Sequence, residues 1–197
     1  SSLLILHGEF ARGPSEWSSP RTPNNLATNN LGKARELAAL LEGVPFIVTT
    51  PQEEGITLDV DETGATFEEN AALKARAFAT ASGLLALADD SGLEVDALGG
   101  EPGPLSARYA GPQASDEERV RYLLGKLDGI EWAERGARFR SIIALVQPQG
   151  AVLFFEGMCE GVIAFDPRGS GGFGYDPIFA FPKSHRTMAE LTPQEKH

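Results

Sequence analysis

The chain has 197 residues, of which 42% are hydrophobic and 23% are charged, and its formal net charge is −11. This length and composition are typical of a soluble globular protein with one domain, or with one domain in two lobes. The negative charge leaves no basic excess for a nucleic-acid partner, and no apolar run reaches the length of a membrane span, so we expect neither partner. The single cysteine, Cys159, excludes an internal disulfide framework and indicates a reducing, cytoplasmic location.

The first part of the chain shows no hydrophobic periodicity and is rich in glycine, proline, serine and arginine. We expect residues 1–24 to be a loose N-terminal arm, or a segment added to the natural chain. Organised sequence begins after it, and we expect residues 25–197 to form a single domain with two lobes.

A helix cap is indicated at Thr28 to Asn30, and leucines at helical spacing predict a helix from near Leu31 to Gly43. Free N–H groups at the start of that helix, beside Lys33, would make an anion site. A plain capped helix with a solvated lysine is the alternative. Residues 46–49 then predict a short strand.

An alanine-rich helix is predicted from Thr66 to Ser82. Thr66 as cap and Glu69 three residues later have the spacing of a capping box. Because apolar residues recur along it at helical spacing, we expect its buried stripe to include Leu73 and Phe78.

The stretch that organises the chain is an apolar run from Leu84 to Ala88, followed by Asp89, Asp90 and Ser91. The run predicts a buried strand that stops at the paired Asp residues, and open α/β sheets bind their ligands where strands stop. Two adjacent carboxylates are costly to bury unless a cation, a proton or solvent separates their charges. An ordinary Asp-Asp-Ser-Gly turn between two strands is the alternative.

The second half of the chain is rich in strands. A capping box at Ser115 starts a helix, and residues 139–146 and 152–155 predict a hairpin, followed by another strand over 157–165. A Gly-rich loop over 169–176 leads to a further apolar segment. Strands that alternate with helices, together with this hairpin, predict an α/β fold with a mixed sheet and a second lobe.

Taken together, these motifs supply the parts of a nucleotide-handling site. Mg²⁺ takes few protein carboxylates and keeps water and phosphate oxygens as its other ligands, while lysines neutralise phosphates as point charges. A Gly-rich loop lets main chain approach a ligand, and aromatic side chains beside it can pack on a flat base, although a mobile connection is the alternative. No Walker, dinucleotide or zinc-ligand spacing is present in the sequence. The candidate acids are Asp61, Glu62, Asp89 and Asp90, the lysines are Lys33, Lys74 and Lys196, and the aromatics are Phe173 and Tyr175.

Ordered motifs run through most of the chain. They are T-N-N-L-G-K at 28–33, E-T-G-A-T-F-E-E-N at 62–70, A-D-D-S-G-L at 88–93, G-G-E-P-G at 99–103, S-A-R-Y at 106–109, G-G-F-G-Y-D-P at 171–177, and A-E-L at 189–191 with E-K at 195–196. In these motifs and their spacing the chain closely resembles the non-canonical purine nucleoside triphosphate pyrophosphatases, the inosine triphosphatase (Ham1/RdgB-like) family. The resemblance covers residues 26–197.

The resemblance implies hydrolysis of ITP, dITP and XTP to the monophosphate and pyrophosphate, with Mg²⁺ as cofactor, which cleanses the nucleotide pool. It implies an elongated α/β structure with a central sheet flanked by helices, two lobes around a substrate cleft, and a homodimer. It also implies a Ser-His-Arg motif after Glu195 and Lys196, so we expect this chain to lack its C-terminal segment.

The same resemblance assigns the site residues. Asp90 resembles the general base and metal-linked carboxylate, with Asp89 as its catalytic partner. Either Asp61 or Glu62 matches the second acid at the metal. The positions that match substrate contacts are Thr28, Asn29, Asn30, Leu31, Gly32, Lys33, Lys74, Ser91, Phe173, Gly174, Tyr175, Asp176 and Lys196.

Two alternatives stay open at this point. A Maf-type pyrophosphatase would act on pyrimidine or modified nucleotides, and a nucleotide-binding protein would bind its ligand without turnover. The adjacent Asp89 and Asp90, together with the lysines, favour an enzyme.

Overall fold

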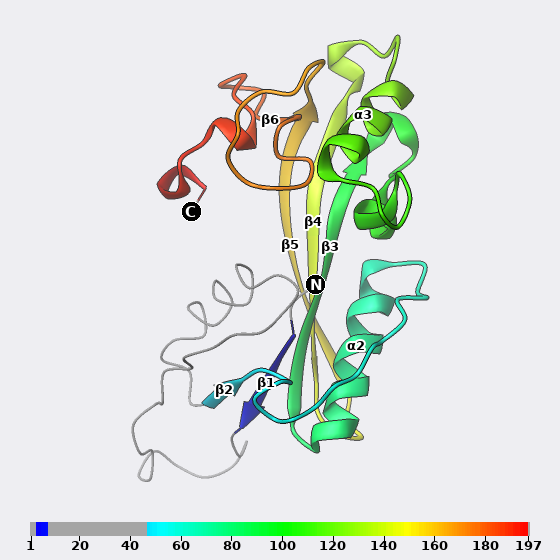
Figure 1. The fold of residues 1–197 in the computed structure, drawn as a ribbon, viewed down its shortest axis with the longest axis vertical. Helices are drawn as coiled ribbons and strands as arrows, with labels where there is room; N and C mark the ends of the chain where they lie inside the picture. Colours follow the sequence, from blue (N-terminus) through cyan, green and yellow to red (C-terminus); the bar gives the residue numbers. More distant parts are fainter. Residues whose placement is uncertain (1–2, 8–46, 197) are drawn as a thin grey trace. The chain divides into compact units, whose positions relative to one another are not determined.

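The computed structural model of the protein describes residues 3–7 and 47–196. Its strands form one six-stranded sheet in the order β2-β1-β3-β4-β5-β6, and the chain combines helices and strands in an α/β fold, as the sequence predicts (Figure 1). The pairings β1–β2, β1–β3 and β5–β6 are antiparallel, whereas the sequence predicts a mixed sheet. The strands are β1 (Leu3–His7), β2 (Ile47–Thr49), β3 (Leu85–Val95), β4 (Gly136–Val146), β5 (Val152–Ile163) and β6 (Phe179–Ala180). The α-helices are α2 (Phe67–Ser82) and α3 (Asp116–Lys126), and the short 3-10 helices are η1 (Asp96–Leu98), η2 (Gly103–Arg108), η3 (Trp132–Glu134), η4 (Met188–Glu190) and η5 (Pro193–Glu195).

Strand β1 lies between β2 and β3 and pairs antiparallel with both. The prediction of a loose arm over residues 1–24 is therefore wrong for Leu3–His7, because an apolar run of this length can fill a strand position. The rest of that arm, and the helix and anion site expected from Thr28 to Gly43, lie outside the described residues. Strand β2 confirms the short strand expected at 46–49.

The chain divides into two compact units, residues 1–90 with 142–156 and residues 91–141 with 157–197. These units agree with the two lobes expected from the sequence, and each is described by itself. The substrate cleft expected between the lobes stays a prediction. No helix in the described ranges is long and apolar enough to cross a membrane.

In the first unit, α2 packs against β3 and β4 through a core of small and aromatic side chains (Figure 1). Thr66 caps the helix by accepting a hydrogen bond from the N–H of Glu69, as the capping-box spacing predicts. The expected burial of Phe78 is confirmed, but that of Leu73 is wrong, since its side chain is 40% exposed. Alanines let the sheet approach the helix closely, and the buried face is centred on them. Its members are Phe67, Asn70, Ala71, Lys74, Ala75, Phe78 and Ala79.

Strand β3 continues past the point where the sequence predicts its end. The whole span Leu85–Val95 is extended, so Asp89 and Asp90 lie inside a strand. The predicted strand end and the alternative turn are therefore both wrong. Consecutive side chains of a strand point to opposite faces, so the two carboxylates do not share one site. Asn70 and Lys74 of α2 donate hydrogen bonds to the Asp90 carboxylate, and a polar side chain with such partners can remain buried within a sheet.

In the second unit, α3 begins with the complete capping box that the sequence predicts. Ser115 accepts a hydrogen bond from the N–H of Glu118, and the Glu118 carboxylate accepts one from the N–H of Ser115 at 2.7 Å. The helix buries its apolar face in the core of this unit. That core includes Leu93, Val95, Val120, Leu123, Leu127, Ile163, Tyr175, Ile178 and Phe179.

Strands β4 and β5 are neighbours in the sheet and follow one another in the chain, as the predicted hairpin requires. Strand β5 is a single strand of 12 residues, although the sequence predicts two separate strands over this region. Gly157, at which the second of these strands is predicted to begin, has no positive φ and does not turn the chain.

A buried arginine ties the end of α3 to the segments that follow it. Arg135 is only 4% exposed. Its guanidinium donates to the main-chain oxygens of Leu127 at 2.8 Å, Ile130 at 2.9 Å and Ala164 at 3.1 Å. It also lies 4.3 Å from the ring centre of Phe165. Carbonyl oxygens and a ring face thus replace the water that this cation loses on burial.

Candidate active site

The acid–lysine cluster consists of Glu62, Asn70, Lys74, Asp89 and Asp90, all in the first unit. At its centre, Nζ of Lys74 lies 3.1 Å from Oε1 of Glu62 and 3.3 Å from Oδ1 of Asp90. The same atom donates to the main-chain oxygen of Asp89 at 2.7 Å. Asn70 and Lys74 are one helical turn apart on the buried face of α2, which directs both toward β3.

Asn70 fixes the second oxygen of Asp90. Its Nδ2 donates to Oδ2 of Asp90 at 3.3 Å, and its Oδ1 accepts from the N–H of Gly64 at 2.8 Å. A Cβ at Gly64 would lie 2.7 Å from that Oδ1, so the bond requires glycine at this position. Because each end of the amide has its own partner, the Asp90 carboxylate is held in one orientation.

Burial raises the pKa of Asp90 above its ordinary value, and the negative charge of Glu62 adds to the rise. The positive charge of Lys74 and the hydrogen bonds from Lys74 and Asn70 oppose it. Asp89, next to it on the strand, meets Lys74 through its main-chain oxygen. The carboxylate that crowds Asp90 is thus Glu62, from a distant part of the sequence, and not the neighbouring Asp89.

The sequence leaves open whether Asp61 or Glu62 is the second acid at the metal, and the structure distinguishes the two. Glu62 is half-buried and faces Lys74, whereas Asp61 is exposed. Among the residues that the structure describes, no three or more His, Cys, Asp and Glu side chains are grouped to hold a metal ion. Mg²⁺ needs only one or two protein carboxylates, and those of Glu62 and Asp90 already converge on one cationic atom. This donor set fits Mg²⁺.

The glycine loop, residues 169–176, lies in the second unit. Phe173 is 63% exposed and stands between Gly172 and Gly174, which both have positive φ. Oδ2 of the buried Asp176 accepts from Nζ of Lys196 at 3.0 Å and from the N–H of Phe173 at 3.4 Å. A Cβ at Gly172 would overlap that carboxylate and lie 2.8 Å from the Lys196 ammonium, so this ion pair requires a glycine there.

Tyr175 does not accompany Phe173 on the surface of the loop. It is 4% exposed, packs in the core of the unit, and donates its hydroxyl to the main-chain oxygen of Ser106 at 2.9 Å. The expectation that Tyr175 packs on a base is therefore wrong. Burial also raises the pKa of its hydroxyl, so it serves as a donor that fixes the loop to the core.

The structure places the predicted site residues in two groups and leaves one group undescribed. It brings Glu62, Lys74 and Asp90 together in the first unit, and Phe173 to Asp176 with Lys196 in the second. Ser91 lies on β3 and is half-buried. The positions predicted at 28–33 lie outside the described residues.

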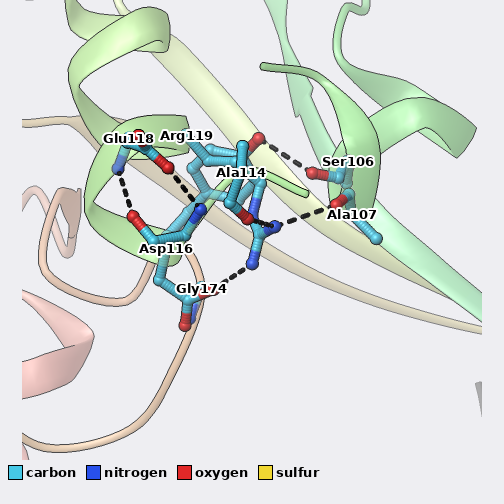
Figure 2. A network of polar contacts seen from close by, with 9 residues as sticks. Ser106, Ala107, Ala114, Asp116, Glu118, Arg119 and Gly174 are labelled. Carbon is cyan, nitrogen blue, oxygen red and sulfur yellow. Dashed lines mark hydrogen bonds and ion pairs between the residues drawn. The ribbon is translucent and has the colours of Figure 1, made fainter. Parts of the chain in front are cut away.

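Sequence reasoning missed three residues that hold these groups in place. Asn70 carries a detectable signal, because it is a polar residue at core spacing on α2, one turn before Lys74. Asp116 and Arg119 carry no such signal in the sequence, because the loop that they hold is distant in the chain. In Figure 2 the two side chains join the start of α3 to Gly174 of the glycine loop.

The chain is similar to known proteins over most of its length. The sequence profile of the Ham1 family matches residues 25–197. A protein from Methylococcus capsulatus named dITP/XTP pyrophosphatase is 52% identical over 87% of this chain and 86% of its own length. One of the same name from Halalkalibacterium halodurans is 48% identical over 87% of this chain and 89% of its own.

The fold is similar to that of solved Ham1 structures. A HAM1 protein from Coxiella burnetii is 46% identical and superimposes with a TM-score of 0.79, covering 86% of this chain and 87% of its own. The Ham1 protein of Staphylococcus aureus is 42% identical with a TM-score of 0.72, over 86% of each chain. With a profile match over most of the sequence and relatives about half identical to it, the chain belongs to the Ham1 family.

Proposed function

We propose that this protein is a hydrolase of acid anhydrides that converts the non-canonical purine nucleoside triphosphates dITP, XTP and ITP to the monophosphate and pyrophosphate. The observation that carries the proposal is the acid–lysine cluster, present in a chain about half identical to proteins named dITP/XTP pyrophosphatase. The activity removes these nucleotides from the cellular pool. The Ham1 match favours this reading over the Maf-type and non-catalytic alternatives.

Asp90 and Glu62 are the residues that would hold Mg²⁺, and Asp61 is exposed beside them. When bound, the ion would offset the negative charge of the triphosphate. Lys74 forms ion pairs with both carboxylates, and its ammonium is equally suited to a phosphate oxygen. Support for the metal comes from the donor set, in which two carboxylates face one cation.

The reaction is attack of water on the α-phosphorus. The water oxygen forms a bond to phosphorus while the bond to the bridging α–β oxygen breaks, and pyrophosphate leaves with the electron pair. Asp90 orients the water and accepts its proton, and its raised pKa makes it a better proton acceptor than an ordinary carboxylate. Lysine ammonium groups stabilise the charge that builds on the leaving pyrophosphate.

The glycine loop is proposed to receive the purine base. Phe173 offers an exposed ring for stacking, and glycines on either side let the main chain approach the base edge. Hypoxanthine and xanthine carry a 6-oxo group where adenine carries an amino group. A site whose N–H groups point at the 6-position favours the oxo bases and leaves unpaired donors against adenine.

A homodimer in the cytoplasm completes the proposal. Strand β5 borders β4 on one side, and on the other it pairs with β6 at Val162 and Ile163. The start of β5 carries Leu153, Phe154 and Phe155, which are 54%, 48% and 55% exposed. An apolar stretch of this kind favours a partner, and a second copy is the proposed one. The single cysteine supports the reducing compartment.

The deciding experiment measures turnover of dITP, XTP and ITP against ATP, GTP and dUTP, with phosphate release coupled to an added inorganic pyrophosphatase. We expect kcat/KM for the first three to exceed that for ATP by at least about 10², the discrimination that unpaired polar groups can supply. Phosphate release only in the presence of the coupling enzyme identifies pyrophosphate as the product. Comparable efficiency on ATP, preference for dUTP, or binding without turnover would each refute the proposal.

A further inference from the structure

A carboxylate at the start of α3 anchors the glycine loop from outside it. The N–H of Gly174 donates to Oδ2 of Asp116 at 2.6 Å, across 58 residues of sequence. Oδ1 of the same carboxylate accepts from Nη2 of Arg119 (Figure 2). Both oxygens of Asp116 therefore face donors. We call Asp116, Arg119 and Gly174 the loop anchor.

Arg119 holds the carboxylate in place from the rest of the second unit. Its Nη1 donates to the main-chain oxygens of Ala107 at 3.0 Å and Ala114 at 2.5 Å (Figure 2). A guanidinium is a planar fork, so these acceptors leave it little rotational freedom. The main chain of Asp116 is fixed as well, because it is the first residue of α3 and directly follows the N-cap residue Ser115.

The loop anchor acts on the main chain next to the exposed ring of Phe173. On one side, the N–H of Phe173 donates to Oδ2 of Asp176. On the other side, the N–H of Gly174 donates to Asp116. Carboxylates thus hold the main chain on both sides of the exposed ring, although Gly172 and Gly174 both adopt positive φ and would be flexible without these bonds.

We propose that Asp116 is a positioning residue that sets the direction of Phe173 toward the purine base, through the N–H of Gly174, with Arg119 as its support. This inference rests on the function proposed above for the glycine loop. Without the anchor, the loop must be ordered anew at each binding event. Because the loop anchor holds the segment proposed to bind the base, whereas the proposed proton acceptor Asp90 belongs to the acid–lysine cluster, its loss raises KM and leaves kcat nearly unchanged.

Asp116→Asn is the decisive variant. An amide has one oxygen acceptor and one nitrogen donor, so in either orientation an N–H group faces the donor of Arg119 or of Gly174. The loss of one charge-assisted hydrogen bond predicts a rise of about tenfold in KM for ITP in both Asp116→Asn and Asp116→Ala. The expected change in kcat is less than about twofold.

Matched controls come from the same helical turn. Glu117→Gln removes the same charge from an exposed neighbour and should leave KM unchanged. Glu118→Ala removes one bond of the capping box and should lower the melting temperature without changing KM. Arg119→Met keeps the Asp116 carboxylate and should raise KM by less than Asp116→Asn does.

A second readout needs no substrate. Hydrogen–deuterium exchange, followed by mass spectrometry of peptides covering residues 169–176, reports the protection of the Gly174 amide directly. We expect exchange there to be about tenfold faster in both Asp116 variants and at the wild-type rate in Glu117→Gln.

Unchanged KM together with unchanged exchange in Asp116→Asn would overturn the inference, and so would a loss confined to kcat. These outcomes differ from a failure of the proposed function. If the wild-type protein does not turn over ITP, the proposed function fails, while the exchange experiment still decides whether Asp116 holds the loop.

Discussion

The acid–lysine cluster and the glycine loop are both built on ion pairs, but among the described residues they combine carboxylates and cations in different ratios. In the cluster, the two carboxylates of Glu62 and Asp90 face the single ammonium of Lys74. In the loop, the carboxylate of Asp176 faces Lys196, and the loop anchor likewise matches one carboxylate to one guanidinium. The one-to-one pairs fix geometry, whereas two carboxylates that converge on one ammonium also form a donor set that would suit Mg²⁺. In the proposed function, the cluster does the chemistry and the glycine loop selects the base.

The largest expected effect concerns catalysis by the acid–lysine cluster. Asp90→Asn keeps the size of the side chain but removes its charge and basicity, so kcat on ITP should fall by about 10²–10⁴-fold. The measurement is steady-state turnover with saturating Mg²⁺. A kcat near that of the wild type would remove Asp90 from the mechanism and erase the distinction between the two regions.

The next effect compares lysine removal in the two regions. Lys74→Met leaves two carboxylates facing one another in a nearly buried site and should lower the free energy of unfolding by about 3–5 kcal/mol. Lys196→Met should cost about 1–2 kcal/mol, because its partner Asp176 still accepts a hydrogen bond from the loop. Urea unfolding of both variants without metal gives the two values. Equal losses would show that charge balance does not distinguish the regions.

Metal binding should stabilise the first region through Glu62 and Asp90. At free Mg²⁺ about 100 times its dissociation constant, the free energy of unfolding should rise by about 2.7 kcal/mol. Glu62→Gln should lose this gain, while Asp61→Asn, an exposed neighbour of the same charge, should keep it. The readout is the melting temperature in a Mg²⁺ titration, which does not depend on turnover. A full shift in Glu62→Gln would place the ion elsewhere.

The smallest effect is a pH dependence in metal-free protein. Burial raises the pKa of Asp90 in the native state, so the native carboxyl binds its proton more tightly than the unfolded one does. Wild-type stability therefore falls as pH rises from the ordinary carboxyl pKa through the raised one. Asp90→Asn lacks this group, so the stability of the variant minus that of the wild type should increase across this interval. If the stability difference between Asp90→Asn and the wild type does not change with pH, burial does not raise the pKa of Asp90.

The features predicted correctly from sequence are local ones. The caps of α2 and α3 follow from a Thr or Ser with a Glu three residues later, because the capping bonds lie within one helical turn. The α/β class follows from alternating helical and strand patterns. The ordered motifs likewise indicate the Ham1 family before any geometry is known.

The errors arise where a distant segment decides the structure. Asp89 and Asp90 look like a turn, but Asn70 and Lys74 of α2 satisfy Asp90 inside the strand, and short-range patterns contain no sign of that contact. Tyr175 looks like a partner of the exposed Phe173, but its burial depends on how the loop packs on the core of the second unit. The link from Asp116 to Gly174 spans 58 residues and leaves no periodic signal.

Gly64 and Gly172 limit the substitutions that this sequence can accept during evolution. At Gly64 a Cβ would lie 2.6 Å from the Cβ of Glu69 and 2.7 Å from the amide oxygen of Asn70, and at Gly172 it would overlap the carboxylate of Asp176. A single substitution at either glycine therefore displaces a functional group and has no neutral intermediate. A change at Asn70 would leave the contact between position 64 and Glu69, and a change at Asp176 would leave the positive φ of Gly172, so both glycines should be retained even when their polar neighbours vary. A saturation library at Gly172 should recover glycine alone, whether or not Asp176 is also varied.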